Sequence, residues 1–180
     1  MSIPSYITLL RIILIFPIMY LIITPSFWNN LWALSLFLVA GLTDYLDGYV
    51  ARKTSSETSL GALLDLLADK LLVCIILIWY VYVNPDTLLI IPALFIISRE
   101  LIVSVLRQYI AELAGDNNVK VMNIGKSKTT IQFIAISLLI ISPNFGYFFE
   151  LTSVGFLWFA AFLSLYSLYS YISEWKKFFN

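Results

Sequence analysis

Histidine is absent from this 180-residue sequence, and cysteine occurs once, at Cys74. Without histidine the protein lacks the usual zinc ligand, the usual general base and any Ser–His or Cys–His catalytic pair. A single cysteine excludes an intrachain disulfide and a thiolate metal cluster. Any catalysis must therefore depend on carboxylates, lysine, arginine, tyrosine or metal ions.

Charged residues are also scarce. They make up 12% of the chain, whereas 61% of the residues are hydrophobic. A soluble domain of this size needs roughly 25% charged residues to cover its surface, so most of this surface must face lipid. The formal net charge is zero, which gives no indication of nucleic-acid binding. The composition predicts a membrane protein.

Six apolar stretches are long enough, or nearly so, to cross a hydrocarbon core that requires about 20 helical residues. Three of the breaks between them contain proline in a turn-forming context, at Pro25, Pro85 and Pro143. We therefore expect a single all-α domain over residues 1–180, an integral membrane bundle of six transmembrane helices. The predicted spans are 5–24, 31–52, 60–83, 88–112, 125–142 and 150–172.

The distribution of basic residues predicts the orientation of these spans. In a six-helix arrangement, all the lysines and arginines of the connections and the C-terminal end fall on one side. The positive-inside rule then places both termini in the cytoplasm. These residues are Arg52, Lys53, Lys120, Lys126, Lys128, Lys176 and Lys177.

The first apolar stretch has an alternative interpretation as a signal peptide, because Arg11 precedes an apolar run. No small-x-small cleavage site follows it, and further spans come after it. We therefore expect this stretch to be the first membrane span.

Four aspartates flank the connection between the second and third predicted spans. Asp44 and Asp47 are three residues apart, and Asp65 and Asp69 are four residues apart. At these spacings the members of each pair share one face of a helix. Because the connection is short, we expect the two helices to be antiparallel neighbours. All four carboxylates should then meet at the cytoplasmic face.

Converging carboxylates repel one another and need a compensating charge. A single Asp within a membrane helix costs roughly 2.5–3.5 kcal/mol on insertion scales, and less near the interface. Carboxylate oxygens suit hard cations such as Mg²⁺ or Mn²⁺, and two such ions about 3.5–4 Å apart could hold a diphosphate for displacement at phosphorus. Arg52 would neutralise further phosphate charge. Gly48 and Gly61 would let the two helix backbones approach closely.

This segment resembles the signature of the CDP-alcohol phosphatidyltransferase family, D-x2-D-G-x2-A-R-x8-G-x3-D-x3-D. All of its fixed positions are present in the sequence. They are Asp44, Asp47, Gly48, Ala51, Arg52, Gly61, Asp65 and Asp69. The resemblance implies six membrane helices, a homodimer and an active site open to the cytoplasm.

The resemblance also implies a role for each motif residue. Asp44, Asp47, Asp65 and Asp69 would bind the metal ions, and Asp69 would also be the general base for the acceptor hydroxyl. The CDP-lipid would be bound by Gly48, Arg52 and Gly61. The deprotonated hydroxyl would attack the phosphorus bonded to diacylglycerol, and CMP would leave.

Basic residues in the second half of the chain bear on the acceptor alcohol. Arg99 and Glu100 fall near the middle of the fourth predicted span, where ionisable residues usually face a polar interior. Together with Arg107 and Lys126, Arg99 could form a pocket for the phosphate of glycerol 3-phosphate. The alternative is a structural Arg–Glu pair together with lysines placed by the positive-inside rule, which is the interpretation we favour for Lys128.

Similarity over most of the chain is greatest to family members that use glycerol 3-phosphate. The similar segments are Ile3-Pro4, Thr8 to Arg11, Ser98 to Leu101, Leu106-Arg107, Ala111 to Leu113 and Ile124 to Thr130. The expected reaction is therefore phosphatidyl transfer from CDP-diacylglycerol to glycerol 3-phosphate. A cardiolipin synthase, or another family member with a different acceptor alcohol, is the nearest alternative.

Three other interpretations of the aspartates remain. They could be ordinary interfacial charges, the ion site of a cation transporter, or remnants in an inactive scaffold. Transporters usually bind ions near the bilayer midplane between repeats, and this sequence shows no repeat. Four aspartates with two glycines and an arginine at set spacings favour metal-dependent chemistry over all three.

Overall fold

In the computed structural model, the residues that the structure describes form six α-helices and one short 3₁₀ turn. The structure describes the backbone of residues 3–54, 59–114 and 124–179, and the side chains of residues 8–43, 67–106, 108, 109 and 129–173. The helices are α1 (Ile3–Ile23), α2 (Phe27–Thr54), α3 (Ser59–Val83), α4 (Thr87–Ala114), α5 (Ile124–Ile141) and α6 (Tyr147–Phe179), with the 3₁₀ turn η1 (Ser142–Asn144) before α6. Each α-helix corresponds to one predicted apolar stretch, so the all-α prediction is confirmed.

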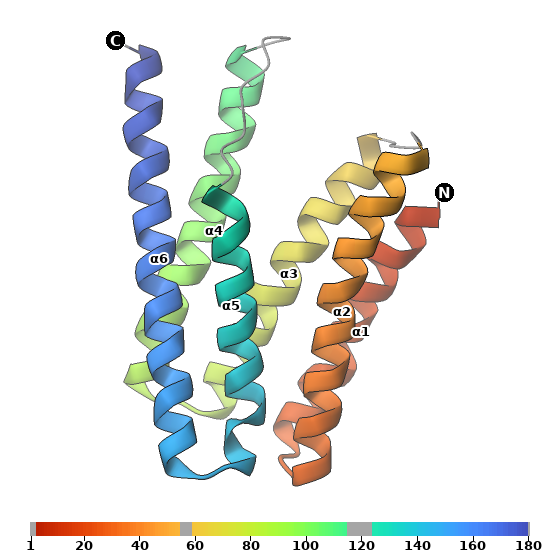
Figure 1. Ribbon diagram of the computed structural model, residues 1–180, viewed down its shortest axis with the longest axis vertical. Helices are drawn as coiled ribbons and strands as arrows, with labels where there is room; N and C mark the ends of the chain where they lie inside the picture. The colour runs from red at the N-terminus through yellow and green to blue at the C-terminus, as the bar shows by residue number, and fades with distance from the viewer. Residues whose placement is uncertain (1–2, 55–58, 115–123, 180) are drawn as a thin grey trace.

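The six helices run alternately up and down along one long axis (Figure 1). As a result, the end of α2, the start of α3, the end of α4 and the start of α5 lie at the same end of the bundle as the two termini. We call this end the charged end, because it carries the motif aspartates and most of the basic residues.

The helices form two groups of three. Helix α1 packs extensively against α2 and α3, and α6 packs extensively against α4 and α5.

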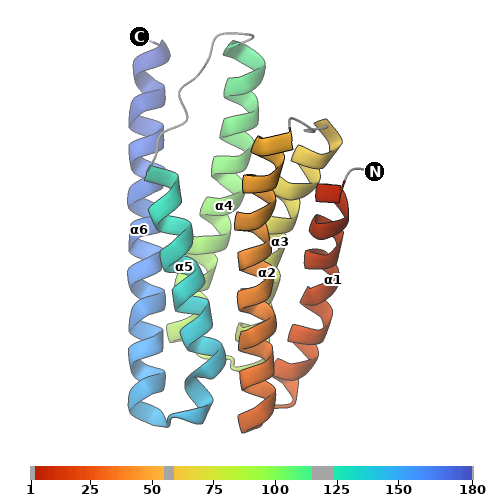
Figure 2. The same ribbon diagram turned by 45° about the vertical axis from the view of Figure 1, so that its right-hand side comes forward.

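The two three-helix groups meet mainly where α2 faces α5 and where α3 faces α4 (Figure 2). Contact between the groups is less extensive than contact within them. The aspartate-bearing helices α2 and α3 therefore belong to one group, and the helices that carry Arg99, Arg107 and Lys126 belong to the other.

The helix connections at the opposite end of the bundle have clear local causes. The hydroxyl of Ser26 accepts a hydrogen bond from the backbone N–H of Asn29 at 3.1 Å, which caps the start of α2. The Asp86 carboxylate accepts one from the N–H of Leu88 at 3.0 Å and caps α4 in the same way. Gly146 has a φ of 80°, a left-handed conformation that glycine adopts without strain, between η1 and α6. The predicted turns around Pro25, Pro85 and Pro143 are confirmed.

Small residues line many of the helix contacts, and large apolar side chains cover the outside. Alanines and serines from several helices are buried, among them Ala33, Ala40, Ala160, Ala161 and Ser164. In hydrocarbon, association of helices depends on close packing and interhelical hydrogen bonds, and small residues favour both. The exposed large side chains include Phe16, Tyr20, Trp28, Val105, Phe162 and Tyr166.

Two of the described helical stretches are long and apolar enough to cross a membrane. They are Thr87–Leu106 in α4 and Tyr147–Ser173 in α6. Only about a third of each is buried inside the protein, so most of their apolar surface faces outward. Three shorter apolar stretches lie in α1, α2 and around α5. The structure thus supports an apolar helical bundle with at least these two membrane-compatible helices.

Helices α2 and α5 approach closely at Gly41, three residues before Asp44 in the sequence. A methyl group placed on Gly41 would lie 2.2 Å from Cζ of the Phe133 ring. That ring is stacked against Phe37 on α2, with 4.3 Å between ring centroids, which restricts its movement. The missing side chain at Gly41 therefore allows α2 to lie against α5 at this point of the helix.

We predict that Gly41→Ala lowers thermal stability. The added methyl overlaps the Phe133 ring, and overpacking of this kind costs about 1–3 kcal/mol. The measurement is the midpoint of thermal unfolding of the purified protein in detergent. Combining Gly41→Ala with Phe133→Leu should restore much of the loss, because the shorter side chain vacates the overlapping volume.

Gly155→Ala on α6 is the matched control. No atom lies within 4 Å of a methyl group at Gly155, so this variant should be neutral or more stable by roughly 0.5–1 kcal/mol from helix propensity. Equal midpoints for Gly41→Ala and Gly155→Ala would contradict the close approach of α2 and α5.

Candidate active site

The motif aspartates lie on α2 and α3 towards the charged end of the bundle. Asp44 and Asp47 are in the C-terminal half of α2, and Asp65 and Asp69 are in the N-terminal half of α3. These two helices run in opposite directions, and these segments both point to the charged end (Figure 2). The prediction that α2 and α3 are antiparallel is confirmed. Direct contact between them is slight, and α1 packs against both.

Two predicted site residues, Asp69 and Arg99, have described side chains. For the others the structure gives the helix but not the side chain, so their contacts remain predictions. These are Asp44, Asp47, Gly48 and Arg52 on α2, Gly61 and Asp65 on α3, Arg107 on α4 and Lys126 at the start of α5.

Asp69 is exposed. Asp65 lies one helical turn before it on the same face of α3. Among the side chains that the structure describes, no three carboxylate, cysteine or histidine residues come together, and three of the four motif aspartates lie outside that set. The donor chemistry fits Mg²⁺ or Mn²⁺, because these residues offer only carboxylate oxygens and at least one is open to solvent.

Helix α1 contributes a buried cation beside the aspartate helices. The Arg11 side chain is fully buried, and Thr8, one turn away, is 2% exposed. A buried charge requires a compensating charge or several hydrogen bonds. The acidic residues on α2 and α3, the two helices against which α1 packs, are the four motif aspartates. Arg11 therefore supplies positive charge to the same three-helix group. This role was not predicted from the sequence, in which this segment was interpreted only as the first apolar span.

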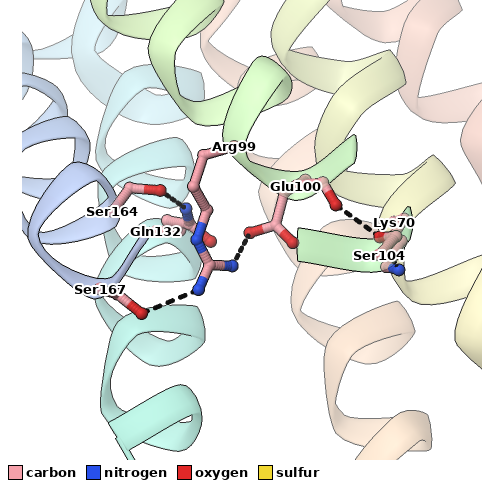
Figure 3. Close-up of polar contacts among 7 residues, drawn as sticks. All are labelled: Lys70, Arg99, Glu100, Ser104, Gln132, Ser164 and Ser167. Atoms are coloured by element: carbon pink, nitrogen blue, oxygen red, sulfur yellow. Dashed lines mark hydrogen bonds and ion pairs between the residues drawn. The ribbon is translucent and has the colours of Figure 1, made fainter. Parts of the chain in front are cut away.

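Arg99 lies at the interface of α4 with α6 (Figure 3). Its side chain is 6% exposed, and Nη1 lies 3.3 Å from the Glu100 carboxylate. Nη2 donates a hydrogen bond of 2.8 Å to the hydroxyl of Ser167 on α6. The structural Arg–Glu pair considered from the sequence is therefore present. The arrangement fixes the guanidinium inside the second three-helix group.

A second buried contact adds α5 to this polar cluster. Gln132 on α5 is 1% exposed, and its Nε2 donates a hydrogen bond of 3.3 Å to the Ser164 hydroxyl on α6. Ser164 and Ser167 are three residues apart and share one face of α6 (Figure 3). Hydrogen bonds between helices in an apolar medium contribute about 0.6–2 kcal/mol each, so this cluster helps to hold α4, α5 and α6 together.

Lys70 and Ser104 form a contact between the two three-helix groups. Lys70 follows Asp69 on α3, and its ammonium donates a hydrogen bond to the Ser104 hydroxyl on α4. No pattern in the sequence connected Lys70 with Ser104. The available signal was a lysine inside an apolar helix, because such a residue usually has a polar partner.

Comparison with known proteins identifies the family of the chain. The sequence model of the CDP-alcohol phosphatidyltransferase family matches residues 1–166, which include both aspartate pairs. The chain belongs to the CDP-alcohol phosphatidyltransferase family. Its members are transferases, so the prediction of an enzyme is confirmed.

Similar bacterial members of this family cover almost the whole chain. Three of them, from Escherichia coli (strain K12), Shigella flexneri serotype 5b (strain 8401) and Shigella sonnei (strain Ss046), are each 37% identical over 172 residues. The alignments span 96% of this chain and 93% of each relative. Each is named CDP-diacylglycerol–glycerol-3-phosphate 3-phosphatidyltransferase.

Proposed function

We propose that this protein transfers a phosphatidyl group from CDP-diacylglycerol to glycerol 3-phosphate, giving phosphatidylglycerol phosphate and CMP. Family membership supports the transfer from a CDP-alcohol, and the names of the relatives support the two substrates. The structural observation that carries the proposal is that the helix segments with the motif aspartates and those with the basic residues lie at the same end of the bundle. The aspartate segments of α2 and α3, the end of α4 with Arg107 and the start of α5 with Lys126 all lie at the charged end.

In the proposed reaction, the acceptor hydroxyl oxygen attacks the phosphorus bonded to diacylglycerol, and its proton passes to the Asp69 carboxylate. The bond from this phosphorus to the bridging oxygen of CDP breaks, and CMP leaves with that oxygen. Asp44, Asp47, Asp65 and Asp69 would hold Mg²⁺ or Mn²⁺, which when bound neutralises phosphate charge. Gly48, Arg52 and Gly61 would bind the CDP-lipid. The exposure of Asp69 supports its role, because a general base must reach its substrate.

Three basic residues would serve the phosphate of the acceptor. Arg107 and Lys126 would contact it directly. Arg99 already contacts Glu100 and Ser167. It would therefore contribute positive charge to the pocket without contacting the phosphate directly. A phosphate monoester requires such a concentration of positive charge, whereas a neutral alcohol acceptor does not.

We further propose that all six helices cross the cell membrane, with the charged end in the cytoplasm, and that the protein is a homodimer. Exposed aromatic residues at the opposite end support a membrane boundary there. They include Trp28, Trp32, Tyr82, Tyr147 and Phe148. Mass photometry of the detergent-solubilised protein measures the oligomeric state.

The activity is tested by offering labelled acceptors to the purified protein with CDP-diacylglycerol and Mg²⁺ or Mn²⁺. The acceptors are glycerol 3-phosphate, phosphatidylglycerol, inositol phosphate and serine. Metal-dependent CMP release with glycerol 3-phosphate alone is the expected result. Release with phosphatidylglycerol would instead indicate a cardiolipin synthase.

We predict that Asp69→Asn lowers kcat by about 10²–10⁴-fold, the usual contribution of a general base. Binding of CDP-diacylglycerol should persist, because an amide preserves the shape of the side chain. Asp86→Asn is the matched control at the far end of the bundle, where asparagine also caps a helix well, and it should be fully active. An active Asp69→Asn enzyme would exclude Asp69 as the base.

We predict that Lys126→Ala raises the KM for glycerol 3-phosphate by roughly 10-fold or more, the effect of losing one charge-assisted hydrogen bond. The KM for CDP-diacylglycerol should change much less. Lys128→Ala, two residues along the chain, is the control and should affect neither KM strongly. Equal increases in both KM values for Lys126→Ala would argue against a contact with the acceptor phosphate.

The orientation is tested with single cysteines in a Cys74→Ser background. Ser26→Cys and Asp86→Cys should react with an impermeant maleimide in intact cells. Asn117→Cys should react only after the membrane is opened. The reverse pattern would place the charged end outside the cell.

A further inference from the structure

A chain of polar contacts connects α3 to α4 beside Asp69. The Lys70 ammonium donates a hydrogen bond to the hydroxyl of Ser104. The same hydroxyl donates a hydrogen bond of 2.5 Å to the backbone carbonyl of Glu100, one turn earlier on α4 (Figure 3). The Glu100 carboxylate is paired with Arg99, which in turn contacts Ser167 on α6. Polar contacts therefore extend from α3 through α4 to α6.

This chain crosses the boundary between the two three-helix groups. Contact between α3 and α4 is less extensive than the contacts of α1 with α2 and α3 or of α6 with α4 and α5, so a specific polar contact has more influence on how α3 and α4 are aligned. Both Lys70 and Ser104 are partly buried. A lysine inside an apolar helix is costly, and such residues usually have a functional or pairing role.

The position of Lys70 also allows it to fix the orientation of the Asp69 side chain. The two residues are consecutive on one rigid helix, so a contact that fixes Lys70 against α4 fixes the rotation of α3 about its own axis. A side-chain tip lies about 5–6 Å from the axis of an α-helix, and a rotation of about 10° therefore moves it by about 1 Å. A displacement of about 1 Å of a reacting group can lower a rate by 10²-fold.

Ser104 lies close in sequence to a predicted site residue on α4, as Lys70 does on α3. Arg107 lies three residues, or nearly one turn, further along the helix towards the charged end. The Lys70–Ser104 contact thus sets the height of Asp69 on α3 relative to that of Arg107 on α4. In the proposed reaction these two residues act on the same acceptor molecule, Asp69 at its hydroxyl and Arg107 at its phosphate.

We propose that Lys70, through Ser104, is a positioning residue that aligns the metal-binding and acceptor-binding halves of the active site. This inference rests on the proposed phosphatidyl transfer. Lys70 does not touch the reacting atoms. It holds α3 and α4 in the register at which the Asp69 carboxylate reaches the acceptor hydroxyl.

The test compares Lys70→Met, which keeps the length of the side chain but removes the ammonium, with Lys70→Arg, which keeps a donor cation. Lys70→Met should lower kcat roughly 10–100-fold while the KM for CDP-diacylglycerol changes little. Lys70→Arg should recover most of the activity, because a guanidinium can still donate to the Ser104 hydroxyl.

A double-mutant cycle tests whether the two residues act as one unit. Ser104→Ala should lower kcat in the same direction, and Lys70→Met combined with Ser104→Ala should be no worse than Lys70→Met alone. Ser137→Ala on α5 is the matched control, because its hydroxyl bonds only to the Phe133 carbonyl of its own helix in the described contacts. This control should retain wild-type kcat.

A distance measurement tests the same inference without turnover. Spin labels at Leu67→Cys on α3 and Leu101→Cys on α4, both exposed positions, report the α3–α4 separation in a Cys74→Ser background. Lys70→Met should shift or broaden the distance distribution, and Ser137→Ala should leave it unchanged. Lys70→Arg should restore the narrow distribution.

The outcomes separate this inference from the proposed function. If the wild-type protein uses a different acceptor, the kinetic comparison is made with that acceptor and the spin-label result stands unaltered. An unchanged distance distribution together with wild-type kcat in Lys70→Met would overturn the positioning role. A fall in thermal stability with unchanged kcat in the folded fraction would also overturn it, because that result indicates a purely structural contact.

Discussion

Compensation of charge in an apolar bundle is the constraint on which the rest of this structure depends. Four carboxylates on two helices of one group, which the family motif predicts to converge, repel one another unless positive charge lies nearby. The protein places a fully buried arginine, Arg11, on the helix that packs against both of these helices. It places Lys70 directly after Asp69 and directs its ammonium to α4. In the proposed function, the remaining negative charge would attract divalent cations to this segment.

The same constraint explains why the buried polar residues of the second group lie in one region (Figure 3). Arg99 is buried, and its Glu100 and Ser167 partners come from α4 and α6. Gln132 and Ser164 continue the cluster to α5. Because the hydrophobic effect contributes little to helix association within lipid, these hydrogen bonds and the small buried residues determine how α4, α5 and α6 fit together. Each group is thus stabilised mainly by contacts among its own helices, and relatively few contacts join the two groups.

The sequence was sufficient to predict the helices and their alternating directions, because long apolar stretches separated by proline-containing turns leave little choice of fold. The charged end was also predictable, since charge avoids the apolar spans. The boundaries were less predictable: α6 continues to Phe179, beyond the expected end at residue 172, because helical backbone continues where apolar character ends. The family motif identified the aspartates through their spacing. The roles of these residues and of the predicted CDP-lipid and acceptor sites remain predictions.

Contacts between distant segments could not be predicted. Lys70 and Ser104 are 34 residues apart, and no periodicity of either helix specifies which residues meet across the boundary. The closeness of Gly41 to Phe133 depends on how α2 crosses α5, which the amphipathic pattern of neither helix determines. The burial of Arg11 was likewise hidden, because one arginine at the start of an apolar run is also consistent with a residue at the membrane surface.

The unequal lengths of the helices have a consequence for how substrates arrive. Helices α4 and α6 extend beyond α1, α2 and α3 at the charged end (Figure 1). At about 1.5 Å per residue, the 33 residues of α6 span about 50 Å, more than the roughly 30 Å of a hydrocarbon core. Helices α4 and α6 therefore project beyond the aspartate-bearing helices α2 and α3 on one side of the bundle. In the proposed reaction, the lipid donor would reach the site by diffusing in two dimensions and the water-soluble acceptor in three. The turnover rate would then follow the mole fraction of the donor in the bilayer and the bulk concentration of the acceptor.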